Sequence, residues 1–77
     1  MIELKKFLKE ASIECPNELS PDQLLRDSSW WDSMARLFFM ATAESECGIV
    51  ITSDDLLNFE VVADLANALN MSVDDSN

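Results

Sequence analysis

Histidine and tyrosine are absent from this chain of 77 residues, which also has only one glycine, two prolines and five basic residues. Without histidine or tyrosine, the sequence lacks the usual general base for a serine or cysteine nucleophile, so we do not expect an enzyme. The scarcity of glycine and proline argues against a turn-rich all-β fold. A hydrophobic content of 48% is too high for a disordered chain. The composition therefore predicts one small, compact helical domain.

The few basic residues are outnumbered by 15 acidic ones, which gives a formal net charge of −10. From Leu37 to the C-terminus the sequence has acids but no basic residue. Such a chain repels phosphate backbones and anionic lipids, so we expect neither nucleic-acid binding nor docking on a membrane. Two explanations of the acidity stay open. It serves basic protein partners, or it only keeps a small apolar domain soluble.

The two cysteines, Cys15 and Cys47, do not have the spacing of metal ligands, so no metal site is expected. The first residues lack the apolar run of a signal peptide. No segment approaches the roughly 18 to 20 apolar residues that cross a bilayer. We therefore expect a cytoplasmic monomer with reduced thiols and no membrane span.

Apolar periodicity predicts three main helices and a short third one. The expected ranges are 2–14, 33–46, 54–58 and 60–69, with a long loop after the first helix. The segment Cys15-Pro16-Asn17 should end the first helix, and Gly48 should cap the second in a left-handed conformation. Residues 49–51 should cross into the core as an extended segment. The prediction is an all-α fold, a small four-helix bundle, with a domain over 1–71 and a disordered tail over 72–77.

Asp32 and Ser33 stand where a stretch rich in turn residues gives way to the second helix. Asp32 is the natural N-cap there, and Ser33 is the first helical residue. This position turns the serine hydroxyl outward, at a helix end whose free N–H groups and partial positive charge favour a bound phosphate. The simplest alternative is that the pair serves only as a helix cap.

The second helix carries two neighbouring apolar stripes. The first is Met34, Leu37, Phe38 and Ala41, and the second is Phe39, Met40, Ala43 and Cys47. A helix that is apolar over so much of its circumference either lies deep in a core or uses one stripe for a partner. The alternative to a partner surface is that Leu37 or Phe38 simply packs inside. Of the adjacent Trp30 and Trp31, we expect one ring to pack over the core and the other to lie exposed near Ser33.

The order of these features resembles the acyl carrier protein family over about residues 2–69. The resemblance rests on an amphipathic first helix, a long loop, Asp32-Ser33-Met34 at the start of the second helix, and the segment 46–51 before a short third helix. The family's motif at this place is Asp-Ser-Leu, from which Met34 departs conservatively. Carrier proteins of the D-alanyl type are similar to this sequence at the Asp-Ser-Met triplet itself.

The resemblance implies that Ser33 carries 4'-phosphopantetheine, attached covalently from coenzyme A by a phosphopantetheinyl transferase that engages Asp32. The thiol of this arm would hold an acyl group as a thioester for acyl-transferring, acyl-activating and acyl-modifying enzymes. A tether of this kind raises the effective concentration of its cargo at each enzyme. The protein itself would catalyse nothing.

The residues expected to recognise partners are Asp32, Met34, Arg36, Leu37, Phe38, Ala41 and Glu44. Many members of the family have acids at the early helix positions that Ala35, Arg36 and Phe38 occupy here. This departure indicates a specialised carrier for fatty-acid, polyketide or secondary-metabolite chemistry. Two alternatives stay open: an aminoacyl carrier of the D-alanyl or peptidyl type, and an unmodified acidic helical module that binds a basic partner.

Overall fold

The computed structural model describes residues 4–16 and 18–71 of the chain. The helices are α1 (Leu4–Glu10), a 3-10 turn η1 (Leu25–Asp27), α2 (Ser33–Thr42), a π-helical turn η2 (Ala43–Cys47), α3 (Ser53–Asn58) and α4 (Val62–Ala68). These ranges contain no strand, and an isolated antiparallel bridge joins Leu24 to Val61. The predicted helical fold is therefore confirmed. The expected disordered tail at 72–77 and the expected start of the first helix at residue 2 lie outside the described residues.

Helix α1 ends at Glu10, earlier than the predicted end near residue 14. Ser12 takes a left-handed conformation with a φ of 64°. Its N–H donates to the Lys9 carbonyl at 3.0 Å, and the N–H of Ile13 donates to the Leu8 carbonyl at 2.9 Å. This pair of hydrogen bonds is a Schellman motif, which closes a helix at its C-terminus. The prediction that the Cys-Pro-Asn segment ends the helix is wrong, because the chain turns before it reaches that segment.

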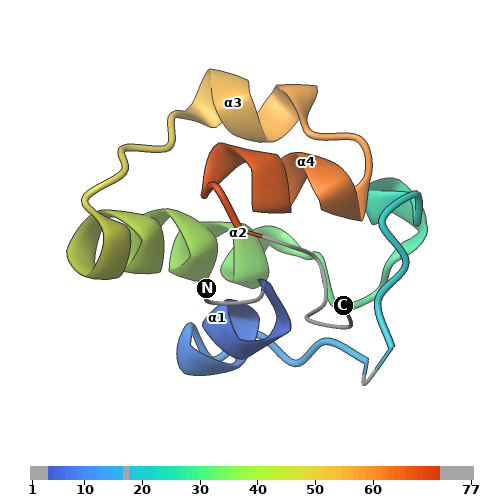
Figure 1. Ribbon diagram of the computed structural model, residues 1–77. Helices are drawn as coiled ribbons and strands as arrows, with labels where there is room; N and C mark the ends of the chain where they lie inside the picture. Colours follow the sequence, from blue (N-terminus) through green and yellow to red (C-terminus); the bar gives the residue numbers. More distant parts are fainter. Residues whose placement is uncertain (1–3, 17, 72–77) are drawn as a thin grey trace.

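Residues 21–23 of the long first loop lie against the start of α4. The backbone N–H groups of Val62 and Ala63 donate to the carbonyls of Gln23 at 3.0 Å and Pro21 at 2.9 Å. The first N–H groups of a helix have no acceptor within their own helix, so the loop supplies the acceptors that α4 needs. Figure 1 shows η1, in cyan, beside the orange start of α4.

Helix α2 begins where the sequence predicts, at Ser33, and its last turn widens into the π-helical η2. Gly48 follows with a φ of 68°, so the predicted left-handed cap is confirmed. The Gly48 N–H donates to the Glu44 carbonyl and the Ile49 N–H donates to the Ala43 carbonyl, both at 3.1 Å. A glycine takes this left-handed conformation without the steric cost that a Cβ atom brings.

The segment 49–51 carries the chain across the helices without forming a strand. Ile51 is buried in the core, whereas Val50 is exposed. Thr52 then caps α3 through a capping box: its hydroxyl accepts from the Asp55 N–H at 3.1 Å, and the Asp55 carboxylate accepts from the Thr52 N–H at 3.0 Å. The predicted short helix is thus confirmed, with its start at Ser53, one residue earlier than expected.

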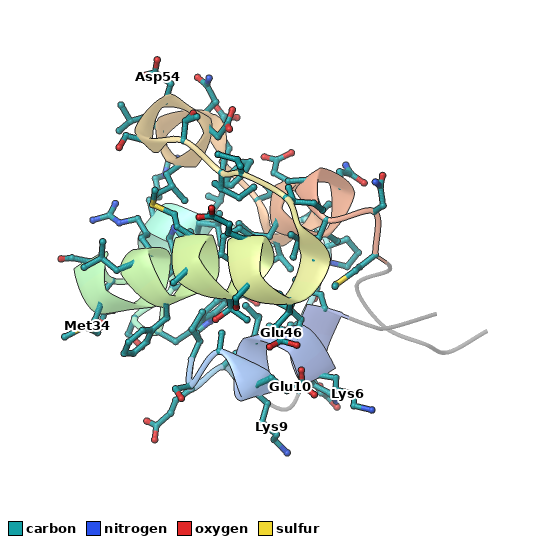
Figure 2. All side chains as sticks on the ribbon, turned by 90° about the vertical axis from the view of Figure 1, so that its left-hand side faces the viewer. Lys6, Lys9, Glu10, Met34, Glu46 and Asp54 are labelled. Carbon is teal, nitrogen blue, oxygen red and sulfur yellow. The ribbon has the colours of Figure 1, made fainter. Side chains whose placement is uncertain are left out.

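The core lies around α2. Figure 1 shows α1 on one side of α2 and α4 on the other, with α3 next to α4, and Figure 2 shows the same arrangement from the side. The ring of Phe39 is fully buried and packs edge-to-face on Phe7 at 5.6 Å and on Phe59 at 6.2 Å between centroids. The other buried apolar residues are Leu4, Leu8, Ala11, Ile13, Leu25, Ala35, Ala43, Ile51, Val62, Leu65, Ala66 and Leu69. None of the helices in the described ranges has the length and apolar character needed to cross a bilayer.

Candidate functional site

Ser33 lies exposed at the first position of α2, directly after its cap. The Asp32 carboxylate accepts a hydrogen bond of 2.9 Å from the N–H of Ala35, and the Asp32 carbonyl accepts from the N–H of Arg36 at 3.0 Å. Both the side chain and the backbone of Asp32 thereby hold the first turn of α2. Within the described part of the chain, the N–H groups of Ser33 and Met34 have no acceptor. This end of α2 therefore presents a serine hydroxyl together with two free backbone donors.

The two apolar stripes of α2 have different surroundings. Met34 is 58% exposed, Leu37 61% and Phe38 38%, and Ala41 is also exposed. We call these four residues the apolar face. From the second stripe, Phe39 and Ala43 are fully buried and Met40 and Cys47 are half-buried. The alternative that Leu37 packs inside is wrong, while Phe38 lies at the border between the apolar face and the protein interior.

Two charged residues expected to recognise partners lie at different places around α2. Glu44 is exposed in η2, which continues α2, whereas Arg36 is half-buried in the first turn of α2. Figure 2 shows Met34 at the start of α2 and Glu46 at the opposite end, in η2. The predicted recognition residues therefore extend from the N-cap Asp32 along α2 to Glu44 in η2.

The two adjacent tryptophans have distinct contacts. The ring of Trp31 packs edge-to-face on the core ring of Phe39 at 5.6 Å, and Trp30 packs edge-to-face on Trp31 at 6.0 Å. Trp31 thus packs over the core, and the prediction that one of the two rings does so is confirmed. Trp30 is half-buried rather than exposed, and its Nε1 is buried with no hydrogen-bond partner among the described residues.

A hollow of about 380 Å³ opens beside Trp30, between the turn after α1 and the first turns of α2. We call it the Trp30 hollow. Its walls include Glu14, Trp30, Asp32, Met34 and Phe38. Both neighbours of Ser33 therefore line this hollow, and two residues of the apolar face form part of its wall. The sequence does not reveal the hollow, because its apolar pattern predicts a helix over 11–14, where the chain turns instead.

A second hollow, of about 640 Å³, lies on the α1 side and shares residues 12–14 with the first. Lys5, Lys6 and Lys9 line it together with Cys15. Figure 2 shows Lys6 and Lys9 projecting from α1 on the side away from α2. All three lysines of the chain thus gather at one hollow, apart from the end of α2 that holds Ser33.

The cysteines do not form a reactive pair or a metal site in the described ranges. Cys15 and Cys47 are free thiols, both half-buried. Burial raises the pKa of the Cys15 thiol, with smaller opposing effects from a backbone hydrogen bond and from Lys5 and Lys9. Over residues 4–16 and 18–71, no group of three or more cysteine, aspartate or glutamate side chains is placed to hold a metal ion.

Comparison of the chain with known protein families, with curated protein sequences and with solved structures gives no match.

Proposed function

We propose that this chain is a carrier protein that holds acyl intermediates as thioesters on a phosphopantetheine arm attached to Ser33. Its place would be a specialised fatty-acid, polyketide or secondary-metabolite pathway. The observation that carries the proposal is the position of Ser33: it is exposed, it opens a capped helix, and it lies beside an exposed apolar face. The resemblance of the sequence to acyl carrier proteins supports the same assignment.

The residues around Ser33 fit a phosphate ester at this hydroxyl. The N–H groups of Ser33 and Met34 have no acceptor in the described part of the chain, and the N-terminal end of a helix carries a partial positive charge. Phosphate groups bind at helix ends for these reasons. When bound, the arm supplies a flexible tether that ends in a thiol. The exposed hydroxyl leaves the attachment point open to an enzyme.

The other residues of the site have positions suited to partner recognition. Asp32 caps α2 and would also engage the phosphopantetheinyl transferase. The apolar face offers Met34 and Leu37 to acyl-transferring, acyl-activating or acyl-modifying enzymes, because exposed apolar patches mark sites of protein association. Arg36 and Glu44 would add charge discrimination between partners.

We also propose that the four helices form a small bundle around α2. This arrangement agrees with the burial of Phe39, Leu4, Leu65 and Val62. The protein would be a cytoplasmic monomer without catalytic activity of its own.

The test is to incubate the full chain with coenzyme A, magnesium and a broad-specificity phosphopantetheinyl transferase, and to measure the intact mass. We expect the mass of one phosphopantetheine to be added to the wild type and none to Ser33→Ala. The matched control is Ser53→Ala, because Ser53 is likewise exposed and is the first residue of a capped helix, α3. Absence of the addition, or an addition that survives in Ser33→Ala, would reject the carrier assignment in favour of an unmodified interaction module.

Loading assays then separate the two kinds of carrier. An acyl carrier accepts an acyl group from an acyl-transferring enzyme, whereas an aminoacyl carrier accepts an amino acid from an adenylating enzyme. The mass of the loaded chain reports which cargo is attached.

A further inference from the structure

Arg36 is the last basic residue of the sequence and the only one in α2. The residue is half-buried, yet its side chain forms no ion pair and no hydrogen bond within the described ranges. The acid four residues before it, Asp32, uses its carboxylate to accept the N–H of Ala35 at 2.9 Å. Burial removes part of the hydration of a cation, so an anion beside Arg36 would be stabilising.

The position of Arg36 relative to Ser33 suits an anion on the serine hydroxyl. Ser33 and Arg36 are the first and fourth residues of α2. Residues three apart lie on the same side of a helix, with about 5–6 Å between their Cβ atoms. Helix side chains lean toward the N-terminus, so the long side chain of Arg36 leans toward the end of α2 that Ser33 opens. An ester group on Ser33 would therefore come within reach of the guanidinium.

A phosphodiester is an ester that this guanidinium would bind well. Its negative charge lies on the non-bridging oxygens, and the planar fork of an arginine can bind two such oxygens at once. In a chain with a net charge of −10, a local cation also offsets the repulsion that a new anion would meet. The lysines cannot take this role, because all three line the other hollow, apart from this end of α2.

We propose that Arg36 binds the phosphate of the phosphopantetheine arm on Ser33. The identity of the anion rests on the proposed carrier function. The contact is non-covalent and forms once the arm is attached. It holds the first group of the arm against the start of α2, so that the rest of the arm leaves the protein from a defined point. This role is additional to the charge discrimination proposed above.

The test compares the full chain before and after attachment of the arm in the wild type, in Arg36→Gln and in Arg26→Gln. Intact mass confirms that attachment is complete. Glutamine has nearly the same helix propensity as arginine, so Arg36→Gln should fold. Arg26→Gln is the matched control, because Arg26 is the other arginine of the chain and lies exposed in η1, outside α2. Urea denaturation of each form gives a double-mutant cycle that isolates the contact between the arm and the side chain.

Compared with its effect in Arg36→Gln, attachment should lower the unfolding equilibrium constant about threefold further in the wild type and in Arg26→Gln, a factor typical of an exposed ion pair. This difference should shrink in about 0.5 M salt, which screens exposed charges. Two NMR signals report the contact itself. The phosphorus resonance of the arm should move in Arg36→Gln and not in Arg26→Gln. Hydrogen exchange of the Arg36 Nε–H should slow on attachment, by about threefold if the contact has the strength of an exposed ion pair.

An equal effect of attachment on the stability of the wild type and Arg36→Gln would overturn the inference and leave the carrier function in place. A phosphorus resonance that does not move in Arg36→Gln would overturn it too. Equal changes in Arg36→Gln and Arg26→Gln would show a general effect of lost positive charge and would also overturn it. Failure of the transferase to add the arm is a separate result, seen in the mass alone. It would reject the carrier function and, with it, this role of Arg36.

Discussion

The carboxylate of Asp32 accepts a hydrogen bond of 2.9 Å from the backbone N–H of Ala35, and this contact fixes where α2 begins. It leaves Ser33 exposed as the first helical residue. Asp32 also lines the Trp30 hollow. One aspartate therefore connects the start of the helix, the proposed attachment point and the Trp30 hollow.

The two roles proposed for Asp32 can be separated by mutation. Asp32→Ala removes the cap and should lower the free energy of unfolding by about 1 kcal/mol, measured by urea denaturation. Asp32→Asn keeps an oxygen that can accept from Ala35, so it should retain most of the stability. The asparagine variant should nevertheless react more slowly with the transferase, because it lacks the carboxylate. An equal loss of stability in both variants would contradict the capping role.

The adjacent residues Phe38 and Phe39 should respond differently to truncation. Phe39→Ala removes a fully buried ring that contacts three other aromatic rings, so it should cost about 3–5 kcal/mol of unfolding free energy. Phe38→Ala should cost less than half as much, because Phe38 is 38% exposed, yet it should weaken binding of the partner enzyme. If Phe38→Ala lowers stability as much as Phe39→Ala and leaves partner affinity unchanged, the apolar face is not a docking surface.

The buried Nε1 of Trp30 has no acceptor in the described ranges, and an unpaired buried donor typically costs about 1–3 kcal/mol. Trp30→Phe removes this donor and keeps a ring, so the free energy of unfolding should be unchanged or higher. Trp31→Phe is the comparison, because it changes the ring against Phe39 without removing a buried unpaired donor. A loss of more than about 2 kcal/mol in Trp30→Phe would mean that the indole makes a contact worth more than its unpaired N–H costs.

Ser12 and Gly48 both have a left-handed backbone conformation, and substitutions at these two residues should change stability through the backbone alone. Ser12→Gly should raise the free energy of unfolding by up to about 1 kcal/mol, because glycine takes a φ of 64° without steric cost. Gly48→Ala should lower it by about 1 kcal/mol. A Cβ atom at Gly48 would meet nothing within 4 Å, so its cost reports conformation and not a clash. We expect the two substitutions to change the free energy of unfolding in opposite directions, as measured by thermal or urea denaturation. A Gly48→Ala variant that is more stable than the wild type would contradict the assigned left-handed conformation.

The features that the sequence predicts correctly depend on local residue types. Asp32 caps α2 because its side-chain oxygen accepts a backbone N–H group, and Gly48 allows a left-handed turn. The end of α1 escaped prediction because Ser12, a residue that rarely has a positive φ, takes the position usually held by glycine.

Contacts between residues far apart in the sequence could not be predicted from local residue types. The hydrogen bonds from Val62 and Ala63 to the first loop join backbone groups, which every sequence has. Periodicity placed two apolar stripes on α2 but could not tell which one the rest of the fold covers. The Trp30 hollow depends on both the early turn at Ser12 and the exposure of Phe38, so the sequence alone did not reveal it.

The most direct test of the carrier assignment is to locate the modification by fragment-ion mass spectrometry after the transferase reaction. Cleavage after Arg26 and Arg36 releases the peptide 27–36, which contains Ser28, Ser29 and Ser33. We predict that phosphopantetheine is attached to Ser33 alone, because Ser28 is buried and Ser29 does not open a helix. An unmodified peptide after complete reaction of a control carrier protein, or an arm attached to Ser28 or Ser29, would contradict the account.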